Sequence, residues 1–360
     1  MVTTRYDLSR SELSELLEGE PHYRVDQVWD GLHAQHREPA ELTNVPKALR
    51  NTIEELLPPA LTPVREVKAD NDKTIKQLWQ LTDGHLVESV LMHYRDRSTV
   101  CVSSQAGCAM ACTFCATGQV GFDRHLTIGE IVEQVVRAAQ RSGERRVSNV
   151  VFMGMGEPLA NFDQVWPAVE RIHDDLGIGA RKITLSTVGV VPGIERLTQQ
   201  DLPVSLAVSL HSANDRIRNR IAPINRTYPL RKLAEALHSY RRAKNRRLSF
   251  EWAMMAGVND SENAARELAT FARPFNAHVN LIPLNPTPGY STPGTDPESI
   301  IWFQDVLESL GVNATIRANR GADIDAACGQ LRAEQQIALR EKPTRRKTQG
   351  SGSASATLAK

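Results

Sequence analysis

Long apolar runs are missing from this chain of 360 residues. No stretch approaches the roughly 18 apolar residues of a membrane span, and the start, Met1-Val-Thr-Thr-Arg, has no apolar segment of the kind found in secretory signals. Cysteine is also scarce, because only 5 residues are present and three of them are clustered. Such a set argues against a disulfide framework. The sequence therefore predicts a globular protein of a reducing compartment, the cytoplasm, with no membrane segment.

Charge is nearly balanced overall, with a formal net charge of +1, but it is unevenly distributed. Residues 1–60 hold 6 Lys or Arg against 11 Asp or Glu, whereas residues 213–247 hold 11 against 2. The second segment is either a solvated helical face or a surface that contacts phosphate groups, because clustered cations release counterions from a polyanion. Charge alone leaves both interpretations open.

Helical spacing dominates the first part of the chain. Apolar residues recur at helical intervals before Pro58-Pro59 ends the pattern, which predicts a helical accessory domain over residues 1–62. Alternating residues at 75–81 and 85–92 predict paired strands, a β-hairpin adaptor over residues 63–98. The Gly- and Ser-rich end, residues 343–360, is predicted to be disordered.

Strands and helices alternate between these two ends of the chain. Strand-like runs are expected at 99–103, 147–153, 182–188, 204–211, 248–255, 279–284 and 313–317. Helical patterns are expected at 127–142, 163–176, 192–199, 229–244, 261–273 and 297–310. Strands that alternate with helices form a parallel sheet covered by helices. We predict an α/β fold, with a partial (βα)6 barrel over residues 99–342.

Three of the cysteines form a C-x3-C-x2-C run, Cys108, Cys112 and Cys115, with Phe114 just before the last. Three thiolates can hold a [4Fe-4S] cluster whose fourth iron stays open to a small molecule. A structural zinc site with Cys101 as the fourth ligand is the alternative. The spacing, with its aromatic residue, resembles the signature of radical S-adenosylmethionine enzymes.

A second motif lies after the cysteines, where Gly156-Glu157 follows a predicted strand. In parallel barrels the carboxyl ends of the strands carry the active site, and a carboxylate there can accept hydrogen bonds from the amino group of an amino-acid-like cofactor. An acid at a helix N-terminus is the alternative. Ser209 and His211 are two apart on a predicted strand, so both side chains are expected on one face while Leu210 points away.

Six segments together look like successive signatures of one family. They are 101–108 (CVSSQAGC), 154–158 (GMGEP), 185–192 (LSTVGVVP), 209–215 (SLHSAND), 280–286 (NLIPLNP) and 320–330 (RGADIDAACGQ). Their order resembles the bacterial radical S-adenosylmethionine RNA methyltransferases that modify C2 of adenine in 23S ribosomal RNA and in tRNA. The resemblance covers roughly residues 85–332 and implies that the predicted barrel is the radical S-adenosylmethionine barrel.

The resemblance also implies a role for each matching residue. The [4Fe-4S] ligands would be Cys108, Cys112 and Cys115. The residues that contact S-adenosylmethionine would be Gly156, Glu157, Ser186, Ser209, Leu210, His211 and Asn285. The catalytic residues would be Cys328, Cys101 and, as a proton acceptor, Glu88.

The implied reaction uses two molecules of S-adenosylmethionine per turnover. The Cys328 thiolate first takes a methyl group by displacement, since the thiolate is the competent nucleophile. A radical derived from the second molecule then activates this S-methylcysteine, whose methylene group adds to adenine C2. Cys101 removes the C2 proton, and a Cys101–Cys328 disulfide remains to be reduced.

The partners implied are 23S ribosomal RNA, at the peptidyl transferase centre, and tRNA, at the adenine next to the anticodon. An electron donor such as flavodoxin or ferredoxin is implied, and the enzyme is expected to be a monomer. The helical domain, the 213–247 segment, Arg317 and Arg320 are expected to contact RNA, the arginines through its phosphates. Three alternatives stay open: a C8-specific 23S ribosomal RNA methyltransferase, a zinc-stapled RNA-binding protein and a radical enzyme acting on a small molecule.

Overall fold

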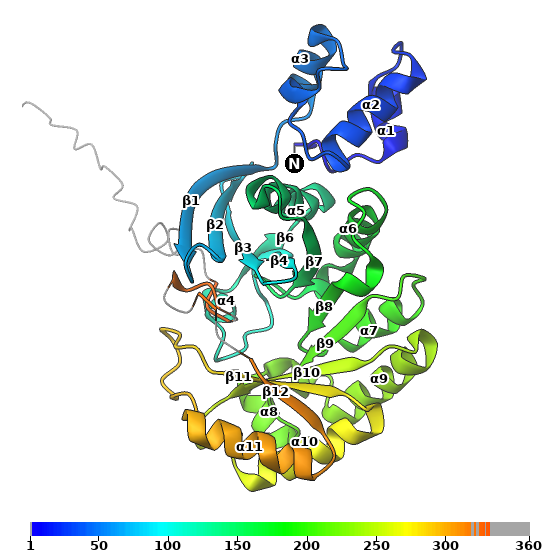
Figure 1. The fold of residues 1–360 in the computed structure, drawn as a ribbon. Coiled ribbons are helices and arrows are strands. Elements are labelled where there is room, and N and C mark those ends of the chain that lie inside the picture. Colours follow the sequence, from blue (N-terminus) through cyan, green and yellow to red (C-terminus); the bar gives the residue numbers. More distant parts are fainter. Residues whose placement is uncertain (1, 318–319, 322–323, 328, 332–360) are drawn as a thin grey trace, which may run out of the picture.

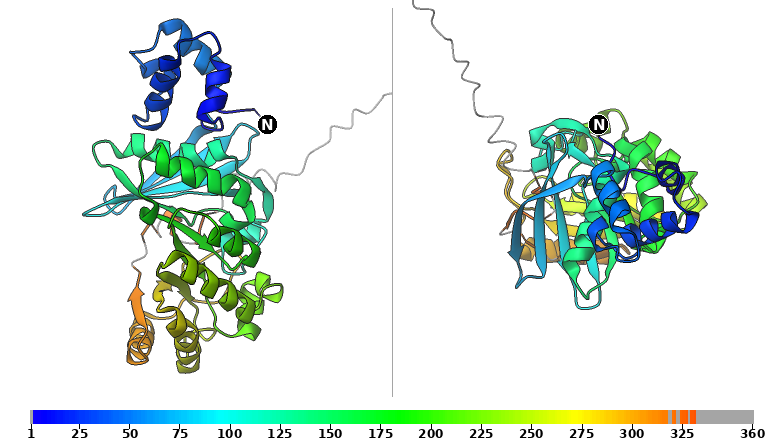
Figure 2. Two further views of the ribbon diagram at one scale, coloured as in Figure 1. Left: turned by 90° about the vertical axis from the view of Figure 1, so that its right-hand side faces the viewer. Right: turned by 90° about the horizontal axis from the view of Figure 1, so that it is seen from above.

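The computed structural model describes residues 2–317, 320–321, 324–327 and 329–331. Three helices come first, α1 (Arg10–Leu16), α2 (His22–His33) and α3 (Lys47–Leu56). They stand apart from the rest of the molecule at the top of Figure 1 and in the left view of Figure 2. The predicted disordered tail, residues 343–360, lies outside the described residues.

One sheet of ten strands forms the body of the molecule, in the order β1-β2-β3-β4-β7-β8-β9-β10-β11-β12. Its first strands, β1 (Leu61–Ala69), β2 (Thr74–Leu81), β3 (Leu86–His93) and β4 (Ser98–Cys101), are antiparallel neighbours. From β4 onward every pairing is parallel, through β7 (Val147–Phe152), β8 (Ile183–Thr187), β9 (Ser205–Ser209), β10 (Leu248–Met254), β11 (His278–Pro283) and β12 (Asn313–Ile316). A small separate sheet pairs β5 (Gln105–Gly107) with β6 (Phe122–His125).

Helices connect the parallel strands and cover the outer face of the sheet (Figure 1). They are α5 (Ile128–Ser142), α6 (Phe162–Asp174), α7 (Val191–Thr198), α8 (Asp215–Ile221), α9 (Leu230–Lys244), α10 (Glu262–Ala272) and α11 (Pro297–Ser309). A further short helix, α4 (Ala116–Val120), lies between β5 and β6. The start of α5 has the capping box that its sequence encodes, since the Thr127 side chain accepts from the Glu130 N–H and the Glu130 side chain accepts from the Thr127 N–H.

The alternation of strands and helices is confirmed, and each predicted barrel strand lies within about two residues of an observed one. The sequence did not predict β1, because five consecutive residues of this strand, Thr62–Glu66, are exposed and three of them are not apolar. Nor did it predict the short elements β5, α4, β6 and α8, which have 3, 5, 4 and 7 residues. None of the helices in the described ranges is long and apolar enough to cross a membrane.

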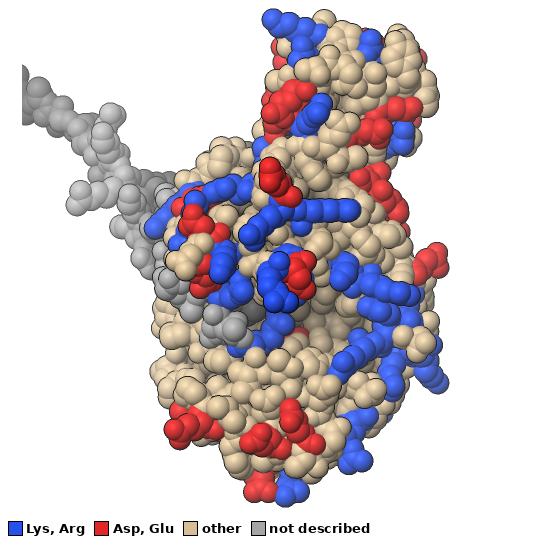
Figure 3. Space-filling view, viewed as in Figure 1, with Lys and Arg blue, Asp and Glu red and all other residues tan. Residues whose placement is uncertain are grey.

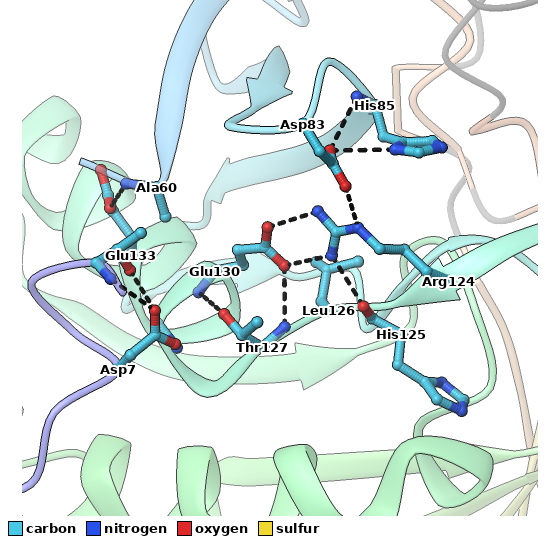
Figure 4. Close-up of polar contacts among 12 residues, drawn as sticks. Asp7, Ala60, Asp83, His85, Arg124, His125, Leu126, Thr127, Glu130 and Glu133 are labelled. Carbon is cyan, nitrogen blue, oxygen red and sulfur yellow. Dashed lines mark hydrogen bonds and ion pairs between the residues drawn. The ribbon is translucent and has the colours of Figure 1, made fainter. Parts of the chain in front are cut away.

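The N-terminal segment attaches to the barrel through hydrogen bonds with the first turns of α5 (Figure 4). Asp7 accepts a hydrogen bond from the Gly129 N–H at 2.8 Å, and Glu133 accepts one from the Ala60 N–H at 2.7 Å. A side chain at Gly129 would collide with this contact, because its Cβ would lie 2.5 Å from the Thr4 hydroxyl oxygen. The glycine therefore permits the close approach.

Arg124 on β6 joins three elements around the same helix end (Figure 4). Its guanidinium donates to both oxygens of Glu130, at 2.7 and 2.8 Å, and also to Asp83 in the turn between β2 and β3. Burial alone would raise the pKa of Asp83, but hydrogen bonds from Arg124 and from His85 hold it well below its usual range. The network ties the antiparallel strands to the first helix of the barrel.

We expect Arg124→Met to destabilise the protein by on the order of 2 kcal/mol, because the substitution leaves the buried Glu130 carboxylate without its ion-pair partner. Urea denaturation followed by far-UV circular dichroism measures the loss. Arg266→Met is the matched control: Arg266 forms an exposed pair with Glu262 on α10, and such pairs contribute about 0.5 kcal/mol. Equal stability of the two variants would contradict a structural role for the network.

Candidate active site

Side chains alternate between the two faces of the parallel strands, and this alternation builds the site. The outward residues are apolar and buried beneath the helices, among them Val150, Leu185, Val208, Phe250 and Leu281. The inward residues are more polar and line two cavities in the barrel, among them Asn149, Ser186, Ser209, Glu251 and Asn280. The barrel interior is thus a polar chamber within an apolar shell.

The first of these spaces, the outer cavity, has a volume of about 160 Å³. Cys108, Cys112 and Cys115 line it, and so do most residues predicted to contact the cofactor. These are Gly156, Glu157, Ser186, Ser209, His211 and Asn285. Cys108 and Asn285, 177 positions apart in the chain, thus meet at the carboxyl ends of the strands, where parallel barrels place their chemistry.

Backbone hydrogen bonds hold the cysteine loop against several parts of the barrel. The Cys108 N–H donates to the Gly121 carbonyl at 2.7 Å, and the Thr113 N–H donates to the Ile221 carbonyl at 3.0 Å. The Ala116 N–H donates to the Gly329 carbonyl at 2.7 Å, which joins the loop to the last described segment of the chain. The three thiols are therefore positioned by main-chain contacts before any cofactor binds.

The three thiols fit a polynuclear cluster better than a single ion. Among the described residues, no group of three or more His, Cys, Asp or Glu side chains is placed to hold a metal ion. Each thiolate of a [4Fe-4S] cluster binds a different iron. The thiols therefore need to line one cavity, but they do not need to converge on a single metal position. Burial raises the pKa of Cys108 to about 12 and raises that of Cys112 as well. The cationic irons would supply the charge that stabilises the thiolates.

Glu157 lines the outer cavity in the loop that follows β7, which ends at Phe152. Its carboxylate accepts hydrogen bonds from the Leu159 N–H at 3.0 Å and the Val188 N–H at 2.9 Å. Burial raises its pKa to about 7, although these backbone hydrogen bonds oppose the rise. A carboxylate held this way is suited to accept hydrogen bonds from the ammonium group of an amino-acid-like cofactor.

Gly156 gives the chain its sharp turn at this point. Its φ is +102°, and a Cβ there would lie 2.6 Å from the Cβ of Gln105. The Gln105 side chain in turn accepts a hydrogen bond from the Glu157 N–H at 2.8 Å. Glycine is therefore needed for both the backbone conformation and the packing of the loop.

His211 reaches the outer cavity by a route that strand alternation does not explain. Strand β9 ends at Ser209, and His211 has a left-handed φ of 55°. Its Nδ1 accepts from the Ala253 N–H at 2.9 Å, so the ring proton lies on Nε2. Burial and the nearby Arg218 lower its pKa to about 3, which keeps the ring neutral. The side chain of Leu210 lies in the apolar core, so only its backbone could contact a cofactor.

Arg218 has a structural role that the sequence did not predict, because its segment was expected to face solvent or RNA. It belongs to the basic segment 213–247, but it is 0% exposed. Its guanidinium donates to the Leu210 carbonyl at 3.0 Å and to the Asn225 side chain at 2.8 Å, and it also reaches the Val188 carbonyl. It therefore ties together the chain ends after β8 and β9. Other members of the segment, such as Arg216 and Arg220, are exposed.

The second space, the inner cavity, has a volume of about 280 Å³ and adjoins the outer one. Four residues line both cavities: Met153, Glu251, Ile282 and Leu331. Cys101, on β4, lines the inner cavity and is 8% exposed. The predicted catalytic Cys328 lies outside the described residues, and so the predicted Cys101–Cys328 disulfide has no support here. Its chain neighbours Ala327 and Gly329 line the inner and the outer cavity respectively.

Glu88 lies on β3 and is 3% exposed. Its carboxylate pairs with the Lys76 ammonium at 3.3 Å, and Lys76 also donates to the Asp325 carbonyl at 3.2 Å. Glu88 shares a face of β3 with Val90 and Met92, which line the inner cavity. Glu88 itself does not line either cavity.

Comparison with known proteins agrees with this geometry. Residues 102–269 match the model of the radical SAM superfamily. Over 93% of its length the chain is 46% identical to the probable dual-specificity RNA methyltransferase RlmN of Chloroflexus aurantiacus and covers 94% of that protein. The chain belongs to the RlmN family of dual-specificity RNA methyltransferases. The RlmN 1 protein of Myxococcus xanthus is similarly close, at 47% identity over 91% of this chain and 94% of its own.

The chain is also similar to a solved structure. A radical SAM methyltransferase from Sphaerobacter thermophilus has a TM-score of 0.90 and 47% sequence identity, covering 92% of this chain and 99% of its own. The predicted fold class, the enzyme class and the cofactors, a [4Fe-4S] cluster and S-adenosylmethionine, are thereby confirmed. A zinc-stapled protein without catalysis does not agree with membership of this family.

We expect Glu157→Gln to lower the affinity for S-adenosylmethionine about 10- to 100-fold, because a hydrogen bond to a charged acceptor is replaced by a neutral one. Isothermal titration of the cluster-loaded protein under anaerobic conditions measures the change. Glu195→Gln, at an exposed position of α7, is the matched control. Unchanged affinity in Glu157→Gln would show that this carboxylate does not hold the cofactor.

Proposed function

We propose that the enzyme methylates C2 of an adenine in 23S ribosomal RNA, at the peptidyl transferase centre, and of the adenine next to the anticodon in tRNA. The two relatives described above carry the name dual-specificity RNA methyltransferase, which supports both RNA classes. The observation that carries the proposal is the pair of adjoining cavities, with the cluster cysteines in one and Cys101 in the other. Such an arrangement suits a reaction that brings a cofactor and a base together from opposite sides.

The residues of the outer cavity would bind and orient the cofactor. Glu157 would accept from its amino group, and the Ser186 and Ser209 hydroxyls and Asn285 would contact its remaining polar atoms. Ser186 and Ser209 lie 3.4 Å apart through their hydroxyl oxygens, which places both on one wall. When bound, the cluster and S-adenosylmethionine supply the methyl group and a radical.

The cysteines outside the cluster would handle the methyl group and the proton. Adenine C2 is electron-poor and does not attack a sulfonium methyl as an amine does, so the methyl group has to be carried to it on the protein. We assign this role to Cys328 as S-methylcysteine. Cys101, already in the inner cavity, would accept the C2 proton. Glu88, paired with Lys76, would assist as a proton acceptor.

RNA would approach the face where basic side chains surround a hollow (Figure 3). At the rim of the inner cavity, the guanidinium groups of Arg97 and Arg320 each lie 4.2 Å from the ring centroid of Tyr94. Arg320 is also held by the His93 carbonyl at 2.9 Å. Arginines stacked on an aromatic ring are well placed to bind phosphate groups. They would hold the RNA while its target base is flipped inward.

Residues 1–62 would form the RNA-binding accessory domain that the sequence suggests, residues 63–98 the adaptor and residues 99–342 the barrel. The enzyme would act as a monomer in the cytoplasm, with a flavodoxin or ferredoxin as electron donor. A reducing compartment suits a chain whose cysteines serve as cluster ligands and nucleophiles.

The decisive experiment compares RNA from cells with and without this protein. Nucleosides from 23S ribosomal RNA and from tRNA are digested separately and measured by mass spectrometry against 2- and 8-methyladenosine standards. We expect 2-methyladenosine to disappear from both pools in cells without the protein. Loss of 8-methyladenosine instead would establish the C8-specific alternative, and an unchanged profile would contradict the proposed function.

We expect Arg97→Ala to weaken RNA binding and to reduce the slope of log affinity against log salt concentration by about one, because one phosphate contact is lost. Fluorescence anisotropy with labelled tRNA at several salt concentrations measures both. Arg266→Ala on α10 is the matched control for removing an exposed arginine. Should both variants show the same slope as the unmodified protein, Arg97 does not contact phosphate.

A further inference from the structure

The wall of the inner cavity carries a group of polar side chains that has no role in the reaction proposed above. Its centre is Glu251 on β10, whose Oε1 accepts from the Asn280 amide at 2.8 Å and from the Ser249 hydroxyl at 3.1 Å. Glu251 and Asn280 are register partners on β10 and β11, so their side chains lie next to each other on the inward face. Burial raises the pKa of Glu251, and the hydrogen bond from Asn280 and the nearby Arg317 guanidinium, which lines the same cavity, oppose this rise.

Part of this group's hydrogen-bonding capacity is unused. Glu251 is 7% exposed, yet among the described residues nothing donates to its second oxygen, Oε2. This oxygen is not fully enclosed by protein, and because Glu251 lines the cavity, the oxygen is accessible from there. A buried carboxyl oxygen that faces a cavity is available to accept a hydrogen bond from a ligand there, and leaving it unpaired is costly.

The position of the group determines which edge of a base it could read. Cys101 is on β4 and Asn280 is on β11, with β7, β8, β9 and β10 between them in the sheet. Since both residues line one cavity inside a curved sheet, they approach it from opposite walls. An adenine whose C2 points toward Cys101 therefore presents its opposite side, the exocyclic amino group N6 and the ring nitrogen N7, toward Asn280 and Glu251.

The chemistry of the group matches that edge. A carboxylate accepts from the N6 amino group, and the carboxamide of an asparagine can donate to N7 and accept from N6, as it does in nucleic-acid grooves. We propose that Glu251 and Asn280 are the specificity-determining residues that recognise the target adenine by its N6/N7 edge. This inference rests on the proposed function and adds to it the contacts that select the base.

The same contacts would reject other purines. Guanine and hypoxanthine carry a carbonyl oxygen in place of the N6 amino group, and this oxygen would face the Glu251 carboxylate, acceptor against acceptor. A site built to hydrogen-bond a group discriminates strongly against an analogue that lacks it, since its own buried polar atoms are then left unpaired. Selection of adenine would thus follow from one carboxylate and one amide on neighbouring strands.

The test uses ligated tRNAs that carry adenosine, purine riboside or 7-deazaadenosine at the position next to the anticodon. Purine riboside lacks only the amino group, and 7-deazaadenosine lacks only N7, while both keep C2. The reconstituted enzyme should methylate adenosine with a kcat/KM about 10- to 100-fold above that for purine riboside. Glu251→Ala should reduce this preference at least several-fold, since only the Asn280 contact to N6 would remain, and Asn280→Ala should reduce the preference for adenosine over 7-deazaadenosine.

Because each result is a ratio between two RNAs on the same enzyme, a general loss of activity or folding cancels. Asn149→Ala, which changes another amide lining the inner cavity, is the matched control and should keep both ratios. If Glu251→Ala keeps the full preference for adenosine, the assignment is wrong. A lower affinity for S-adenosylmethionine with an unchanged preference would place Glu251 in the cofactor site instead. No methylation of adenosine by the unmodified enzyme would overturn the proposed function itself.

Discussion

The alternation of side chains along the parallel strands is the constraint on which the rest of this structure depends. Outward positions such as Val208 and Phe250 bury apolar surface under the helices, and this burial stabilises the barrel. The positions between them can then be polar without weakening the core. Ser209, Glu251 and Asn280 lie side by side on the inward face because β9, β10 and β11 pair in register. The same pairing that builds the fold builds the site.

Loops contribute further side chains to the site, and their positions are fixed by main-chain hydrogen bonds and backbone conformation. The cysteine loop is bound to Gly121, Ile221 and Gly329 through backbone hydrogen bonds, so its thiols are placed independently of their own protonation. The turn at Gly156 and the left-handed backbone of His211 place two more groups that no regular element could present. Preorganisation of this kind lowers the cost of ordering a site around its ligand.

Most of the fold could be predicted from the sequence, because the β/α rhythm and apolar pattern after residue 98 are strong. The missed elements are those in which local pattern is weak: β1 is largely exposed, and β5, α4, β6 and α8 are all short, with 3 to 7 residues. For the site, motif spacing predicted the cysteines and Glu157, which the outer cavity brings together. Arg218 could not be placed correctly, since a cation within a basic segment carries no sign that it will be buried beneath three carbonyls.

By itself, the sequence determined the chemistry available to this protein: three thiols at cluster spacing, two further cysteines and a family pattern that spans the barrel. Only the tertiary structure decided which groups share a space. It divided the interior into two adjoining cavities and placed Cys101 on the wall opposite Asn280. The physical reason is that spacing along a chain sets local conformation, whereas the distance between residues on different strands is set by sheet register and by packing across the barrel.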